Sequence, residues 1–355
     1  MIRLIINNIF LIFNTVAACG LALASLSVLI SPEHIWFMPF AGLAFPFLWG
    51  LNFFFFLWYA LKRRKKCLLS GFILLLSMGL ASRFFSLSGK EYTAPMPDES
   101  FNDCFILSYN VRGMNLADKD GNPKEAGELF DFVVQQNPSI LCFQEFPKSS
   151  VKPATGKQLS EFKNTHIGKK GLFTATIHPI AGVGEIIFPK TRNSCIYTDI
   201  ILNGDTARIY NCHLESNRIL PEEYYIFDEI NLNYDEEQLR DLKSVARKIK
   251  NSSIVRSRQV DSVARHISQS PYPVILCGDF NDTPVSFTYQ SIKKNLDDAF
   301  INSGRGFGIS YKRRLLFLRI DYILYDPSMW KPEAYSCPKI YLSDHFPVLT
   351  HLSKK

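Results

Sequence analysis

The chain has 355 residues, of which 47% are hydrophobic and 21% charged. This hydrophobic fraction is too high for an ordinary soluble protein, so we expect a membrane-spanning part. Residues 1–90 hold eight of the 40 basic residues and one of the 33 acidic ones, which leaves 32 of each for the rest and puts the whole net charge of +7 on the N-terminal part. The balanced remainder argues against a domain that holds nucleic acid mainly through a large positive field.

Two uncharged runs predict membrane-spanning helices. They cover about residues 4–31 and 35–61, and each is long enough to cross about 30 Å of hydrocarbon. Trp36 and Trp58 lie near the two ends of the second run, where interfacial aromatic residues gather. A signal peptide is the alternative for the first run, but the run is too long for one and no clear small-residue cleavage site follows it.

A third run, at about residues 67–87, is shorter and is interrupted by Arg83. The basic residues Lys62 to Lys66 precede it, and such a cluster beside a span marks the cytoplasmic side. If all three runs span, the protein is a multi-pass integral membrane protein, and everything after about residue 88 lies on the outer side. If the third run lies in the interface instead, the following domain is cytoplasmic.

We therefore divide the chain into a transmembrane region of three helices at 1–88, a linker at 89–101 and a domain at 102–355. The linker contains Pro95, Pro97 and several charges, and it has neither a helical nor a strand period. Most of the later cysteines interrupt apolar, strand-like runs, which favours buried free thiols over a disulfide framework.

Short runs rich in β-branched and aromatic residues recur through the domain, and two stretches have helical spacing. The predicted helices cover 124–136 and 235–269, and residues 216–234 look like an irregular insertion. Asn203-Gly204 is a good type I′ turn between two strands, which predicts antiparallel pairing and mixed sheets. The predicted strands cover residues 105–109, 140–143, 196–202, 207–212, 274–277, 320–325 and 346–352.

Polar side chains abut six of these strands, in places where a rigid scaffold usually carries catalytic groups. Taken alone, each has an ordinary explanation: Glu145 as a strand-end charge, Asp279 as a turn residue, His213 as a satisfied histidine. Their joint occurrence in this order favours a functional site. Carboxylate and amide oxygens suit a hard ion such as Mg²⁺ or Mn²⁺, and histidines and aspartates beside it suit activation of water. The stretches are Ser108–Arg112, Cys142–Glu145, Tyr210–Leu214, Gly278–Asp282, Arg319–Ile323 and Ser343–Pro347.

These stretches resemble the endonuclease/exonuclease/phosphatase superfamily, over about residues 102–352. The resemblance implies an α/β fold, a four-layer sandwich with two central mixed β-sheets flanked by helices, and metal-dependent hydrolysis of a phosphoester by in-line attack of water. It also implies that Glu145 is the principal metal ligand, with Asn110 and Asp344 in or next to the metal shell.

The same resemblance assigns the remaining roles. Asp279 orients or deprotonates the attacking water, and Asn281 and His213 hold phosphate oxygens. His345, oriented by Asp321, contacts the scissile phosphate or serves as the base. The sequence does not decide between Asp279 and His345 as the group that activates water, because that depends on geometry.

The substrate stays open between nucleic acid and a phospholipid-derived phosphoester, and tethering at a bilayer favours the lipid somewhat. A basic stretch within 235–258 and a basic-apolar loop at 312–318 are candidate contacts to phosphate or lipid, or solvated and packed surface. No protein partner is predicted. The alternative function is a non-catalytic, membrane-anchored binding module on the same fold.

Overall fold

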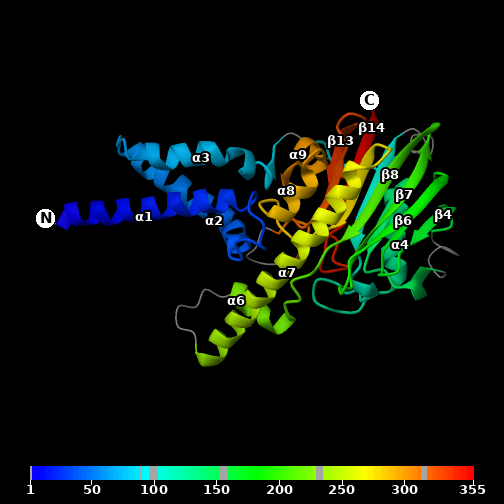
Figure 1. Cartoon of the computed structure of the whole chain (residues 1–355), viewed down its shortest axis with the longest axis horizontal. Coiled ribbons are helices and arrows are strands. Elements are labelled where there is room, and N and C mark those ends of the chain that lie inside the picture. The colour runs from blue at the N-terminus through cyan, green and yellow to red at the C-terminus, as the bar shows by residue number, and fades with distance from the viewer. Residues whose placement is uncertain (1, 88, 96–102, 152–158, 229–234, 313–317) are drawn as a thin grey trace.

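The computed structural model describes residues 2–87, 89–95, 103–151, 159–228, 235–312 and 318–355. Three helices form an arm that projects from a body of β-strands and helices, with the N-terminus at the far end of the arm (Figure 1). The three are α1 (Ile2–Leu26), α2 (Met38–Leu61) and α3 (Cys67–Ala81).

Two segments of the arm are long and apolar enough to cross a membrane, Asn7–Leu26 and Met38–Leu61. The third helix is shorter than the run predicted at 67–87: α3 has 15 residues and spans only about 22 Å. It ends at Ala81 because the chain then turns into the body, where Phe85–Ser86 (β1) pairs with Gly306–Phe307 (β11). Arg83 bonds to the body through the Pro284 carbonyl (2.9 Å) and the Gln290 side chain (2.7 Å).

The body contains two six-stranded sheets, each with one parallel pair among antiparallel neighbours. The first has the order β13 (Trp330–Ser336), β14 (Val348–Lys354), β2 (Cys104–Asn110), β3 (Ile140–Gln144), β5 (Phe173–Thr176), β4 (Asn164–Ile167). The second has the order β10 (Asp297–Asp298), β12 (Asp321–Tyr325), β9 (Val274–Asp279), β8 (Asp205–His213), β7 (Ser194–Leu202), β6 (Ile180–Ile187).

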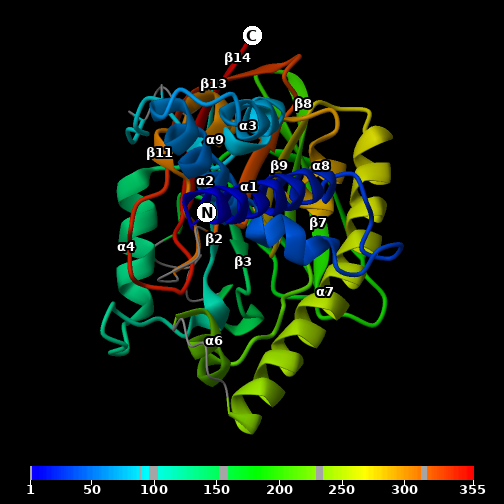
Figure 2. The same ribbon diagram turned by 90° about the vertical axis from the view of Figure 1, so that its left-hand side faces the viewer.

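The two sheets pack face to face, and helices cover their outer faces (Figure 2). Ile106 and Cys142 of the first sheet share a buried cluster with Ile209 and Cys277 of the second. Helix α4 (Ala126–Gln136) covers the first sheet, and α7 (Glu236–Ser268) and α8 (Phe287–Lys293) cover the second. This is the predicted four-layer sandwich. The shorter helices are η2 (Arg112–Met114), η3 (Pro221–Tyr224), α6 (Tyr225–Asp228) and α9 (Ala299–Ser303).

Local sequence accounts for the longest helix and the tightest hairpin. Asp235 caps α7: its side chain accepts from Gln238 N (2.8 Å), and the Gln238 side chain accepts from Asp235 N (3.1 Å). Asn203 and Gly204 join β7 to β8 with φ values of 51° and 87°, the left-handed pair that a type I′ turn requires.

Part of the predicted linker lies against the body. The Tyr92 hydroxyl donates to the Gln136 carbonyl (2.9 Å), Asn137 donates to the Pro95 carbonyl (3.1 Å) and Tyr335 N donates to the Lys90 carbonyl (3.1 Å). Residues 96–101 of the linker lie outside the described residues. All eight cysteines are described, and each has a free thiol.

Candidate active site

Strand register brings the predicted polar residues to one edge of the sandwich. In the first sheet, parallel β2 and β3 end side by side, with Asn110 opposite Gln144 and Glu145 following. In the second sheet, parallel β8 and β9 end with His213 opposite Asp279, and antiparallel β12 begins with Asp321 opposite Asp279. Because the carboxyl ends of both parallel pairs lie at the same edge, residues far apart in sequence meet there.

Asp279 lies at the centre of this group. Its Oδ2 accepts from Asn110 Nδ2 (2.9 Å) and Asn281 Nδ2 (3.1 Å), and its Oδ1 accepts from Asn281 N (2.8 Å). Oδ2 also lies 3.7 Å from Nε2 of His213 and 3.7 Å from Nε2 of His345. Burial raises the pKa of Asp279 to about 6, and the two histidines oppose this rise.

Glu145 and His213 face each other across the two sheets. Glu145 Oε1 lies 3.6 Å from His213 Nε2 and accepts from Asn110 Nδ2 at 3.2 Å. The Glu145 side chain is 41% exposed, whereas His213 is buried, and its Nε2 has no hydrogen-bond partner among the described residues. A buried nitrogen without a hydrogen-bond partner, placed between two carboxylates, is positioned to bind a ligand.

His345 is held by Asp321. Its Nδ1 donates to Asp321 Oδ2 at 2.9 Å, which turns Nε2 toward Asp279, and both residues are buried. Burial alone would lower the pKa of His345, but the carboxylates of Asp321 and Asp279 raise it to about 10. The two carboxylates therefore favour the protonated form of His345.

Two residues hold left-handed backbone conformations at the site, Glu145 with a φ of 53° and Asn281 with a φ of 52°. Such strain in non-glycine residues gathers at functional sites. Asn281 is fixed by a bond from Nδ2 to the Leu214 carbonyl (3.0 Å). Asp344 lies at the side of the group, with Oδ2 3.7 Å from the Arg112 guanidinium, and Ser343 Oγ connects it to the Asn110 carbonyl.

The described contacts thus join seven of the eight predicted residues directly and place Asp344 beside them. The joined residues are Asn110, Glu145, His213, Asp279, Asn281, Asp321 and His345.

The donor set fits a hard divalent cation. Glu145 offers a carboxylate that is partly exposed, and carboxylate and amide oxygens are the ligands that Mg²⁺ and Mn²⁺ prefer. Asp279, Asp321 and His345 also bring one ligand atom each within 4.8 Å of one another. That trio is the weaker candidate, because its members are buried and already bond to one another or to Asn110 and Asn281.

Several residues that support the site escaped the sequence prediction. The Gln144 side chain donates to Asn211 Oδ1 (2.8 Å), and Asn211 Nδ2 donates to the carbonyls of Phe143 (3.1 Å) and Phe173 (3.0 Å), a buried polar link between the sheets beneath the site. Ser310 Oγ accepts from the backbone N of Asp321 (3.0 Å). Gln144 and Asn211 lie inside two of the stretches that the sequence analysis singles out, Cys142–Glu145 and Tyr210–Leu214, but the sequence assigned neither of them a role.

The basic stretch of α7 is largely paired with the protein itself. Arg256 is 2% exposed and donates to the Glu215 carbonyl, and Lys248 donates to Glu223. Arg258 pairs with Glu33 of the arm. The basic-apolar loop at 312–318 falls mostly outside the described residues, which exclude 313–317.

Comparisons with known proteins identify a family and a fold. A family model described as the Endonuclease/Exonuclease/phosphatase family matches residues 107–345, and one described as a domain of unknown function (DUF8431) matches residues 7–84. No curated protein matches the chain.

Two solved structures share the fold. The catalytic domain of human Nocturnin with a bound sulfate anion is 15% identical with a TM-score of 0.52, and the match covers 71% of this chain and 95% of that one. An endonuclease/exonuclease/phosphatase from Bacteroides vulgatus is 16% identical with a TM-score of 0.51, over 71% of this chain and 99% of that one. At these identities, the likeness is one of fold.

Proposed function

Because this chain belongs to the endonuclease/exonuclease/phosphatase family, we propose that it is a membrane-tethered, divalent-metal-dependent phosphoester hydrolase. One observation carries the proposal: Asp279 Oδ2 lies 3.7 Å from both His213 and His345, and Asn110 joins it to Glu145. Two imidazole groups thus converge on a buried carboxylate at an edge where the Glu145 side chain is open to solvent. This arrangement suits attack of water on a phosphoester.

The roles follow from where each group points. Asp279 orients the water and takes its proton as the water oxygen bonds to phosphorus and the ester P–O bond breaks, and the leaving oxygen regains a proton from solvent. We place the base at Asp279 rather than His345 because His345 lies between the carboxylates of Asp321 and Asp279, which raise its pKa and favour a protonated ring that donates from both nitrogens. His213 and His345 would donate to the phosphate oxygens, where charge develops. Asn281 would hold Asp279 in place, because its Nδ2 donates to the Asp279 carboxylate and to the Leu214 carbonyl.

A divalent cation would be held by Glu145, with Asn110 and Asp344 beside it. When bound, it would supply Lewis-acid stabilisation of the charge on the phosphate. Mg²⁺ and Mn²⁺ are the ions that the oxygen donors favour.

The surface of the arm supports membrane tethering. Only 28% and 22% of its two apolar windows are buried, unlike the core helices of a soluble protein. Large apolar side chains on all three helices face outward, among them Phe13 (61% exposed), Phe47 (52%) and Phe72 (64%). An exposed apolar surface of this extent is typical of contact with lipid.

The test is hydrolysis of a soluble diester, bis(4-nitrophenyl) phosphate, by the full chain in detergent with Mg²⁺ or Mn²⁺. We expect turnover that EDTA abolishes and that Glu145→Gln lowers by roughly a thousandfold, together with loss of Mn²⁺ binding measured by electron paramagnetic resonance. Glu128→Gln, an exposed acid on α4, is the matched control. Mn²⁺ binding without turnover would favour the non-catalytic binding module.

A further inference from the structure

A cavity of about 220 Å³ connects the candidate active site to the membrane arm. Asn281 and Asp344 line one end of it. Pro39 and Leu43, from the first two turns of α2, line the other. A group bound in this cavity therefore touches two residues at the side of the candidate site, Asn281 and Asp344, and the first turns of a candidate span.

The loop that carries Asn281 is fixed to the arm. Val285, four residues later, is fully buried in a cluster with Leu21, Phe45 and Phe84 of the arm and its exit. At Gly42 of α2, a Cβ would lie 2.3 Å from the Val285 carbonyl oxygen, so only glycine allows this approach. The cavity is thus a built junction between α2 and the site, because both of its walls are held in place.

The lining is mixed, with polar side chains beside the Asn281 loop, the apolar Ile320 next to Asp321, and apolar side chains beside α2. Near Asn281 it presents Ser253 and the buried guanidinium of Arg256, which bonds to Asp282 (3.3 Å). Toward α2 it presents Ile219 and Leu43, which belong to one apolar cluster. This distribution matches an amphiphile whose phosphate lies at the catalytic end.

A stripe of exposed apolar residues continues from the cavity along α2. Leu43 is followed by Phe47, Leu51 and Phe54, at spacings of four, four and three residues, which place them on one face of the helix. Their exposed fractions are 52%, 43% and 48% for Phe47, Leu51 and Phe54. An acyl chain lying along this face would lead directly to the cavity.

We propose that the substrate is a membrane phospholipid whose phosphate enters the site through this cavity while its chains stay along α2; the inference rests on the proposed function. The volume agrees with this division, because pockets that enclose a whole drug-sized ligand hold about 300 to 1,000 Å³. A cavity of about 220 Å³ accepts a head group and its ester linkage and leaves the chains outside.

The experiment compares hydrolysis of membrane lipids with hydrolysis of a soluble diester. The full chain is placed in nanodiscs of phosphatidylethanolamine, phosphatidylglycerol and sphingomyelin. Phosphorus NMR follows hydrolysis of the lipids, and absorbance follows bis(4-nitrophenyl) phosphate. We expect metal-dependent hydrolysis of at least one lipid, and Leu43→Trp, which fills the apolar end, to lower the ratio of lipid to soluble-substrate turnover at least tenfold. Ile219→Trp, from the opposite wall and outside the arm, should do the same, whereas Leu75→Trp on the exposed face of α3 should leave the ratio unchanged.

Three results would overturn the inference. Turnover of the soluble diester or of a DNA oligonucleotide without hydrolysis of any lipid would leave the proposed function standing and remove the lipid. An unchanged ratio in both cavity variants would remove the cavity as the route. Absence of metal-dependent turnover of any substrate would overturn the proposed function, and this inference with it.

Discussion

A carboxylate that is 1% exposed needs partners for its charge, and Asp279 has two amide side chains, a backbone N–H and two nearby imidazoles. Asp321 is equally buried, yet its Oδ1 has no hydrogen-bond partner among the described residues, so its one strong contact is to His345. We therefore propose different roles for the two aspartates. Asp279 would face the reacting phosphate, and Asp321 would act through His345 as a positioning residue.

Replacing the positioning residue should separate turnover from binding. Asp321→Asn keeps the size of the side chain but removes the charge that orients His345, so we expect kcat for bis(4-nitrophenyl) phosphate to fall by roughly 10² to 10⁴ while KM changes less than threefold. Steady-state kinetics measure this split, with the exposed Asp120→Asn as control. A rise in KM at constant kcat would show that Asp321 contributes to substrate binding instead.

A histidine outside the site should make the stability of the body depend on pH. His178 is buried, and burial lowers its pKa to about 4, below the ordinary 6.5 of the unfolded chain. Between these values the unfolded state binds the proton more readily, so stability is full above about pH 6.5 and is lost as the pH falls toward 4. We expect the Tm of the full chain in detergent to drop between pH 7 and pH 5, and to drop less in His178→Gln. An equal drop in that variant would assign the effect to other groups, and the exposed His34→Gln should behave as the wild type.

At the scale of elements, the two parallel strand pairs position the site, and Gly278 is what allows the second pair to form. It has a φ of 141°, and a Cβ there would lie 1.9 Å from the Cys212 carbonyl oxygen on the neighbouring strand. Asp279 follows it directly, opposite His213. The close approach of β8 and β9 therefore sets the distance between a carboxylate and an imidazole of the site.

Adding one methyl group at Gly278 should test this. Gly278→Ala forces β8 and β9 apart, so we expect a loss of about 3 kcal/mol in the free energy of unfolding and a fall in turnover of at least a hundredfold. Gly121→Ala is the matched control, because Gly121 also has a positive φ (88°) but open space around it. Thermal unfolding and diester turnover, measured on both variants, separate collision from backbone strain. Equal losses of stability and turnover in the two variants would mean that the contact between the added methyl group and the Cys212 carbonyl contributes nothing beyond backbone strain.

Among the strands, the sequence predicts best those that form continuous apolar runs, and it predicts the two long helices from the helical spacing of their apolar residues. Strands such as β2 and β9 are fully buried and read as continuous apolar runs. Strands β4, β6 and β13 were not predicted, because each lies at the edge of its sheet and mixes exposed with buried residues, and β13 contains Pro332. The site residues were predictable because they lie in short motifs, whereas the link from Gln144 to Asn211 depends on packing between sheets that a one-dimensional pattern does not contain.

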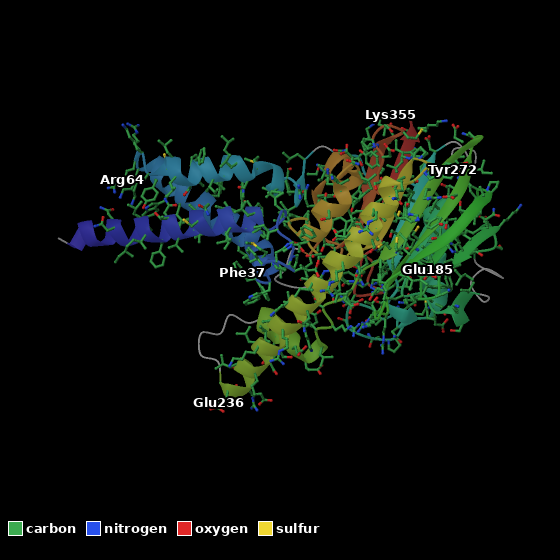
Figure 3. All side chains as sticks on the ribbon, in the orientation of Figure 1. Phe37, Arg64, Glu185, Glu236, Tyr272 and Lys355 are labelled. Atoms are coloured by element: carbon green, nitrogen blue, oxygen red, sulfur yellow. The ribbon has the colours of Figure 1, made fainter. Side chains whose placement is uncertain are left out.

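At the scale of the whole molecule, the basic loop and the catalytic body lie at opposite ends of the arm. Figure 3 labels Arg64 at the end away from the body and Phe37 at the end beside it. Glu33, in the same turn as Phe37, pairs with Arg258 of α7. The loop between α1 and α2 and the body must therefore lie on the same side of any membrane that the two helices cross.

This arrangement predicts the orientation of the protein. Five consecutive basic residues, Lys62 to Lys66, resist translocation, so we expect them in the cytoplasm. We expect the body outside, provided that α1 and α2 span and that the chain from Cys67 to Leu87 crosses back, because α3 alone covers only about 22 Å. An epitope inserted after Arg64 should be protected from protease added to intact cells, and an epitope after Lys355 should be cleaved. Permeabilised cells, in which both epitopes are cleaved, are the control. Protection of both epitopes in intact cells would place the body in the cytoplasm, on the same side as the basic loop. That result would require α1 and α2 to lie in the membrane interface, because an α2 that crosses the membrane separates Arg64 from the loop that contacts α7.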